Sequence, residues 1–105
     1  MSRARAVQYA VEMRSVVAVD CAGVPSRRDF WERYLDAARP AEGALFGRNL
    51  DAFWDAVEGD GPGSPGDRDL QFENSRALEV IEEGRFRKAL EEIAAATTRI
   101  RIELC

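Results

Sequence analysis

The chain has 105 residues, of which 46% are hydrophobic, and its formal net charge is −4 with no histidine. A chain of this length forms one domain with a single modest core, and none of its apolar runs approaches the ~20 residues that span a membrane. The absence of histidine removes the usual general base and the commonest metal ligand, so conventional acid–base catalysis is not expected.

Residues 1–15 are predicted to be an N-terminal extension with two possible secondary structures. Val7, Tyr9, Val11 and Met13 alternate with mostly polar neighbours, as in a strand, but the same segment is compatible with a frayed helix. We favour a strand within residues 6–13, one that adds to a sheet edge or forms a hairpin through residues 14–15, over disorder of this segment. No continuous apolar stretch of the signal-peptide kind is present, so a cytoplasmic protein is expected.

The next two elements are a strand and a helix. Residues 16–21, V-V-A-V-D-C, are apolar and rich in β-branched side chains, and they predict a buried strand that stops at a Gly-Val-Pro turn. Ser26 then precedes a helical run, with Asp29 three residues later in a looser form of the capping box. The apolar spacing of residues 30–38 predicts a helix that Pro40 ends.

A second helix is predicted within residues 46–58, F-G-R-N-L-D-A-F-W-D-A-V-E. Asn49 is its predicted N-cap. Apolar residues recur there at i, i+3, i+4 and i+7, which places one stripe against a core. These residues are Leu50, Phe53, Trp54 and Val57.

Three acids share one side of this predicted helix. Because successive residues rotate by about 100°, Asp51, Asp55 and Glu58 fall within roughly 60° of arc. Trp54 lies between them and the apolar stripe, so its indole is expected to be half buried. Like charges at i and i+4 cost about 0.2 to 0.5 kcal/mol, so helix stability alone does not explain the aspartates. They either bind something outside the helix or belong to an ordinary solvated face.

The following segment is predicted as loop, strand and helix. Residues 59–66, G-D-G-P-G-S-P-G, are too rich in Gly and Pro for a regular element and predict a surface loop. A short strand is predicted at residues 70–72, and Asn74 or Ser75 is predicted to cap a helix that Gly84 closes.

Two elements complete the predicted fold. Residues 86–93 have apolar side chains at helical spacing and predict an amphipathic helix, and residues 100–104 alternate as a strand. Strands separated by helices imply an α/β fold with a small, mainly parallel three-stranded sheet and flanking helices.

Charge is unevenly distributed along the chain. Residues 42–83 hold eleven acids and three arginines, a balance of −8, whereas residues 1–28 have a balance of +3. A concentrated negative field attracts a basic partner and repels phosphate backbones, so a basic protein is the predicted partner and nucleic acid is not. The N-terminal arginines are interpreted as solvated charges, so no membrane partner is expected.

The carboxylates also admit two chemical alternatives. Asp51 and Asp55 are conceivable as an acid–base pair or as ligands of a hard cation. Adjacent turns of one exposed helix offer no desolvated cleft, and Mg²⁺ or Ca²⁺ needs further oxygen ligands. No catalytic residue, cofactor or metal site is therefore predicted. Cys21 and Cys105 lack C-x-x-C spacing and are predicted to be free thiols.

Residues 46–56, F-G-R-N-L-D-A-F-W-D-A, closely resemble the signature of the barstar family, the intracellular inhibitors of small secreted ribonucleases. The likeness covers nearly everything from Val16 onward. It implies a barstar-like domain at residues 16–105. It also implies an inhibitor that protects its bacterial producer, as antitoxin or immunity protein, from a small barnase-like or guanyl-specific ribonuclease. The acidic helix would block the active site by mimicking RNA phosphates.

The resemblance also implies which residues meet the ribonuclease. Asp55 is expected to enter the phosphate-binding centre, with Asp51 supporting it from one turn earlier. Trp54 would supply flat apolar contact, although a core position is the alternative. Gly47 would allow close backbone approach, and Asn49 would cap the helix or donate a hydrogen bond across the interface.

Glu92 approximates the position of a further acidic contact in the family, with Glu91 and an ordinary solvated glutamate as alternatives. The expected assembly is a free monomer that forms a 1:1 heterodimer with a small ribonuclease that is basic or has a cationic active site. The alternative hypothesis is a barstar-like interaction module whose partner is not a ribonuclease.

The chain departs from the family pattern at two aromatic positions. Leu45 stands where relatives carry an aromatic residue, and the loop that begins at Gly59 replaces a second tryptophan. These departures suggest a different ribonuclease, a smaller apolar contact, or compensation from Glu58 and Asp60.

Overall fold

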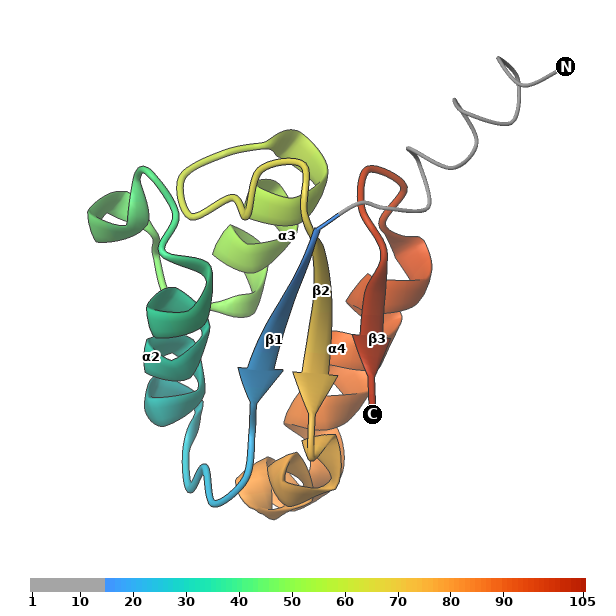
Figure 1. The fold of residues 1–105 in the computed structure, drawn as a ribbon. Helices are drawn as coiled ribbons and strands as arrows, with labels where there is room; N and C mark the ends of the chain where they lie inside the picture. The colour runs from blue at the N-terminus through green and yellow to red at the C-terminus, as the bar shows by residue number, and fades with distance from the viewer. Residues whose placement is uncertain (1–14) are drawn as a thin grey trace, which may run out of the picture.

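The structure, a computed structural model, describes residues 15–105 (Figure 1). The strand predicted within residues 6–13 lies outside the described residues. The elements follow in the order β1 (Val16–Asp20), α2 (Arg27–Ala38), the 3-10 turn η1 (Gly43–Leu45), α3 (Leu50–Gly59), β2 (Asp69–Glu73), the 3-10 segment η2 (Ser75–Gly84), α4 (Arg85–Ala96) and β3 (Ile102–Leu104).

The strands form one parallel sheet in the order β1-β2-β3. Val17 pairs with Leu70, which in turn pairs with Ile102 on the other side. Helices connect strands that run in the same direction, because a parallel pair needs a crossover connection. The predicted α/β fold with a small parallel three-stranded sheet and flanking helices is confirmed.

Side chains alternate between the two faces of the sheet. The residues of the three strands that point to the helices are buried, whereas their neighbours are exposed or partly exposed. In the described part of the chain, the helices therefore pack against one face of the sheet, and the opposite face is open (Figure 1). The buried set comprises Val17, Val19, Leu70, Phe72 and Ile102.

Trp31 of α2 lies at the centre of an aromatic core and is only 1% exposed. Its ring centroid lies 5.5 Å from that of Phe46, 5.4 Å from that of Phe53 in α3 and 5.8 Å from that of Phe86 in α4. One side chain thus contacts two further helices and the segment before α3. This packing holds α3 at Phe53 and α4 at Phe86 against the body of the domain.

The N-caps predicted for α2 and α3 are both confirmed. The Ser26 side chain accepts a hydrogen bond from the Asp29 backbone N–H at the start of α2. The Asn49 side chain accepts one from the Ala52 backbone N–H, 2.7 Å away, at the start of α3. Each bond satisfies one of the four amide groups that a helix start leaves without an intrahelical partner.

The helical segment predicted after residue 74 is present and ends at Gly84, but it is a 3-10 segment and the predicted side-chain cap is wrong. Residues 75–84 are 3-10 rather than α-helical, and they bend where Glu82 and Glu83 have φ values of 52° and 58°. The Asn74 amide donates instead to the Asp20 carboxylate, and the Ser75 hydroxyl donates to the Cys105 carbonyl. Tertiary hydrogen bonds therefore use the groups that were expected to cap a helix.

The loop at residues 59–66 is not simply a surface loop, because Gly63 and Pro65 are buried. The Tyr34 hydroxyl donates to the Gly63 carbonyl over 2.7 Å. Gly63 has a φ of +89°, and a Cβ there would lie 2.5 Å from Cδ1 of Phe46. The loop is therefore part of the core that supports α3.

Gly63→Ala is expected to destabilise the protein by about 2 to 5 kcal/mol, because it adds both a left-handed penalty and a clash. Gly66→Ala is the matched control. Gly66 also has a positive φ of +75°, but no atom lies within 4 Å of a Cβ placed there, so only the backbone penalty of about 1 to 2 kcal/mol applies. Urea unfolding of both variants measures the difference, and equal losses would contradict the packing role of Gly63.

Candidate functional site

Helix α3 separates its apolar and acidic residues as its sequence predicts. Phe53 and Val57 are fully buried, while Asp51 and Asp55 are exposed. Trp54 is partly buried, which confirms the expected half-buried indole. The amphipathic stripe fixes which side of α3 packs on the core, so the aspartates are presented to solvent.

A groove of ≈ 370 Å³ lies between α3 and α4. Its lining is mainly apolar, with Asp51 from one helix and Glu92 from the other as the two carboxylates. The residues that line it are Leu50, Asp51, Trp54, Ala89, Glu92, Ile93 and Ala96. The structure thus brings three residues of the predicted site, Asp51, Trp54 and Glu92, to one place from two helices.

The two glutamates on α4 have different surroundings. Glu91 accepts a hydrogen bond from the Arg87 guanidinium at 3.1 Å and does not line the groove. Glu92 lines the groove and forms no hydrogen bond or ion pair with any described residue. Of the two alternatives, Glu92 is therefore the better candidate for a contact beside Asp51.

The aspartate carboxylates of α3 have no partner in the described part of the chain. Neither Asp51 nor Asp55 forms a side-chain hydrogen bond or ion pair there. Asp55 does not line the groove and lies one turn further along α3. Its backbone carbonyl accepts hydrogen bonds from the Asp60 and Gly61 amides, which close the helix with a left-handed residue. The carboxylate is therefore held on a fixed turn but is open to an external cation.

The segment before α3 has a local reason for its glycine. A Cβ at Gly47 would lie 3.1 Å from the Ala52 Cβ, closer than an ordinary contact. The Asn49 amide donates to the Gly47 carbonyl at 3.2 Å, in addition to capping the helix. Arg48 has a φ of +55° and pairs with Glu32 at 3.3 Å. The glycine at position 47 thus allows the backbone there to lie close to Ala52 of the same chain.

Leu45 and Gly59 lie at the two ends of the motif and are both exposed. Leu45, in η1, is 69% exposed, an unusual environment for a large apolar side chain. Gly59 ends α3, and no atom lies within 4 Å of a Cβ placed there. Both positions are accessible, as a contact with a partner requires.

Glu58 is occupied by contacts within the chain. Its carboxylate accepts hydrogen bonds from the Thr97 hydroxyl at 2.6 Å, from the Thr98 amide and hydroxyl at 2.7 and 2.6 Å, and from the Arg99 amide at 3.3 Å. The Thr97 hydroxyl, followed by the two Thr98 groups, lowers the pKa of Glu58 to about 2. Hydrogen bonds donated to a carboxylate stabilise its ionised form and therefore lower its pKa. The expectation that Glu58 contacts a partner stays a prediction.

Arg99 has a structural role that the sequence alone does not indicate. Its guanidinium donates to the Val57 carbonyl at 2.9 Å and to the Ser64 hydroxyl oxygen at 3.0 Å. It also pairs with Asp60 at 3.6 Å. Asp60, expected to compensate for a missing aromatic contact, is thereby partly neutralised. No local pattern predicts these long-range contacts.

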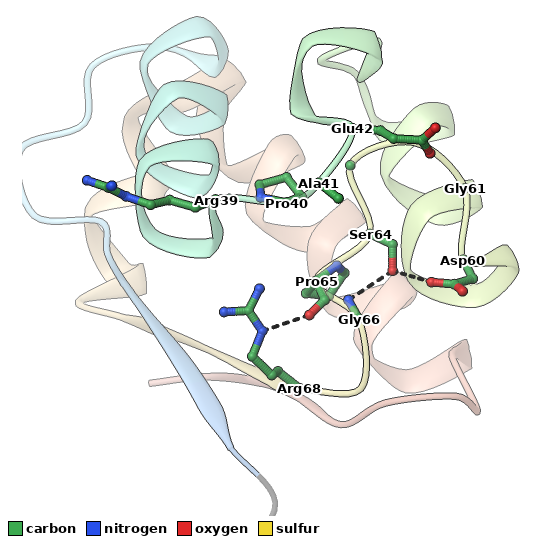
Figure 2. Close-up of a pocket in the computed structure, with 11 residues that line it drawn as sticks. Arg39, Pro40, Ala41, Glu42, Asp60, Gly61, Ser64, Pro65, Gly66 and Arg68 are labelled. Atoms are coloured by element: carbon green, nitrogen blue, oxygen red, sulfur yellow. Dashed lines mark hydrogen bonds between the residues drawn. The ribbon is translucent and has the colours of Figure 1, made fainter.

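A second hollow, of ≈ 320 Å³, lies between the end of α2 and the loop after α3 (Figure 2). Figure 2 shows the hydrogen bonds of Ser64 with Asp60 and with the Gly66 amide, and the bond from Arg68 to the Pro65 carbonyl. Arg68 also donates to the Ala38 carbonyl at 2.7 Å. The polar groups of this hollow thus mainly hold the loop in place, and Asp51, Asp55 and Glu92 do not line it.

Other kinds of site find no support within residues 15–105. No group of three or more Cys, Asp or Glu side chains there is placed to hold a metal ion, and no helix there has the length and apolar character needed to cross a membrane. Both cysteines are free, as predicted, and burial raises the pKa of the Cys21 thiol to about 11. Cys21 is therefore an unreactive core residue.

Comparison with known proteins identifies a family for most of the chain. The family model described as "Barstar (barnase inhibitor)" matches residues 14–103. A comparison with curated proteins gave no match.

The lowered pKa of Glu58 predicts a contribution to stability that depends on pH. The contribution is fully present above the ordinary value of 4.5 and is lost as the pH falls from there to about 2, because the unfolded chain binds the proton first. The unfolding free energy of the wild type should therefore approach that of Glu58→Gln over this range. Urea unfolding between pH 2 and 7 measures both, and a constant difference would contradict the prediction.

Proposed function

Since the chain belongs to the barstar family, we propose that it inhibits a small ribonuclease by covering the enzyme's active site with the acidic side of α3. The observation that carries this proposal is the arrangement of carboxylates beside the groove between α3 and α4. Asp51 and Glu92 line that groove, Asp55 lies one turn away, and all three lack partners among the described residues.

Unpaired carboxylates on a rigid helix suit a cationic active site. A ribonuclease must hold RNA phosphates with cationic groups, and a carboxylate offers those groups the same charge and oxygen acceptors. In the proposed complex, Asp55 enters the phosphate-binding centre and makes charge-assisted hydrogen bonds there. Asp51 and Glu92 bind a second cationic group of the enzyme at the groove. The inhibitor then acts as a charged mimic of the substrate.

Apolar contacts around the acids would complete the interface. Trp54 forms part of the groove wall and offers a flat surface, and aromatic residues commonly anchor protein interfaces. The exposed Leu45 and Gly47 lie before the helix and the exposed Gly59 ends it, and in the proposed complex these positions allow the enzyme to approach closely. Asn49 contributes mainly by capping α3.

The charge distribution supports a basic partner and rapid association. The segment containing α3 carries the −8 balance of residues 42–83, and such a field steers a cationic protein towards it. We propose a 1:1 complex between a monomeric inhibitor and its ribonuclease. The protein would act in the bacterial cytoplasm, where it protects the producing cell from its own enzyme or from a toxin delivered by a neighbour.

Asp55→Ala is expected to weaken the inhibition of a sensitive ribonuclease by about 3 kcal/mol or more, roughly a hundredfold or more in Kd, because the enzyme's buried cation loses its partner. RNA cleavage is measured while wild type or variant is titrated into a panel of small guanyl-specific ribonucleases. Association of the wild type should also slow steeply as the salt concentration rises.

Asp36→Ala is the matched control, because Asp36 is an exposed aspartate on α2, outside α3 and the groove. Equal losses for the two variants would argue against a specific role of Asp55. If the wild type inhibits no enzyme of the panel, small guanyl-specific ribonucleases are excluded as its targets. The alternative of an interaction module with another partner is then favoured.

A further inference from the structure

Glu58 connects the end of α3 to the segment that follows α4. Its four hydrogen bonds all come from residues 97–99, and Thr97 is the C-cap residue of α4. A carboxylate that accepts bonds from two hydroxyls and two amides is held in one orientation. The contact joins residues that are about forty positions apart in the chain.

Arg99 connects the segment after α4 back to the end of α3. Its backbone amide donates to Glu58, while its guanidinium donates to the Val57 carbonyl in the last turn of α3. The same guanidinium binds Ser64 and pairs with Asp60 and Asp67 of the loop after α3, at 3.6 and 3.7 Å for the two pairs. We call Glu58, Thr97, Thr98 and Arg99 the α3–α4 clasp.

The α3–α4 clasp lies at one end of the groove. Trp54 lines the groove one turn before Glu58 on α3, and Ala96 lines it one residue before Thr97 on α4. The clasp therefore ties together the two walls that carry Asp51 and Glu92. A change in the clasp would alter the separation and direction of these carboxylates without removing either of them.

The geometry points to Glu58 as a positioning residue of the binding face, one that sets α3 against α4 through Thr97 and Thr98 rather than by touching the partner. This inference rests on the proposed function for its binding consequence. It differs from the simpler expectation that Glu58 is one more acidic contact. A contact residue would bind the partner through its own charge, whereas a positioning residue acts through the hydrogen bonds that it accepts from Thr97 and Thr98.

The test removes the two hydroxyl donors, leaves the two backbone amides in place and keeps every charge. In the full chain, the double variant Thr97→Val/Thr98→Val lacks both hydroxyls that bind Glu58. The control double variant Thr97→Ser/Thr98→Ser keeps both hydroxyls. Dissociation and association rates are measured on a ribonuclease that the wild type inhibits, at a temperature where circular dichroism shows every variant folded. We expect the Val pair to raise koff about tenfold with kon nearly unchanged, and the Ser pair to return koff to the wild-type value.

A second readout needs no ribonuclease. Residual dipolar couplings of the backbone amides in the free protein report the orientation of α3 relative to α4. The Val pair should change that relative orientation and the Ser pair should not. An unchanged orientation of α3 relative to α4 in the Val pair overturns the inference. An unchanged or slower koff overturns it as well, because a Glu58 carboxylate that is freed to contact the partner directly would give that result. If the wild type inhibits no enzyme, the proposed function fails separately and the couplings still decide the role of the clasp.

Discussion

The packing of Trp31 is the constraint on which the rest of the structure depends. One buried indole contacts Phe46 before α3, Phe53 within α3 and Phe86 within α4. Aromatic rings in such a cluster bury large apolar areas and favour defined mutual angles, so the helices that carry them have little freedom to shift. Apolar contacts on its hidden side and the hydrogen bonds of Glu58 near its end therefore position the acidic helix. The Asp51 and Asp55 carboxylates make no contact with the described residues that holds the fold.

Acidic residues serve two distinct purposes on the same helix. Glu58 accepts four hydrogen bonds inside the chain and supports the structure, whereas Asp51 and Asp55 have no partner among residues 15–105. Unpaired acids a turn apart repel each other and contribute little to stability. Under the proposed function, a cationic enzyme would offset this repulsion, and membership of a family described as "Barstar (barnase inhibitor)" supports that proposal.

Local patterns predicted the parts of the fold that depend on local physics. The caps at Ser26 and Asn49 and the amphipathic stripe of α3 follow from hydrogen-bonding capacity and side-chain periodicity within a few residues. The parallel sheet follows from the alternation of strands and helices along the chain. The central role of Trp31, the buried loop at Gly63 and the contacts of Arg99 depend on residues distant in sequence, which a single chain does not reveal. Asn74 illustrates the limit, because its amide binds Asp20 across the fold instead of capping the adjacent turn. For the candidate site, the helix and its acids were predictable from the sequence. The choice of Glu92 over Glu91 needed the structure, because only Glu92 lines the groove between α3 and α4.

The groove between α3 and α4 makes recognition a property of the folded domain and not of a linear epitope. Helix α3 has 10 residues, and a peptide of this length is mostly unstructured in water because helix nucleation is unfavourable. Its counterpart wall belongs to α4, which follows only after a strand and a 3-10 segment. Occupancy of the surface by any partner is therefore thermodynamically linked to folding, so a bound partner lowers the population of unfolded chains and with it their exposure to cellular proteases.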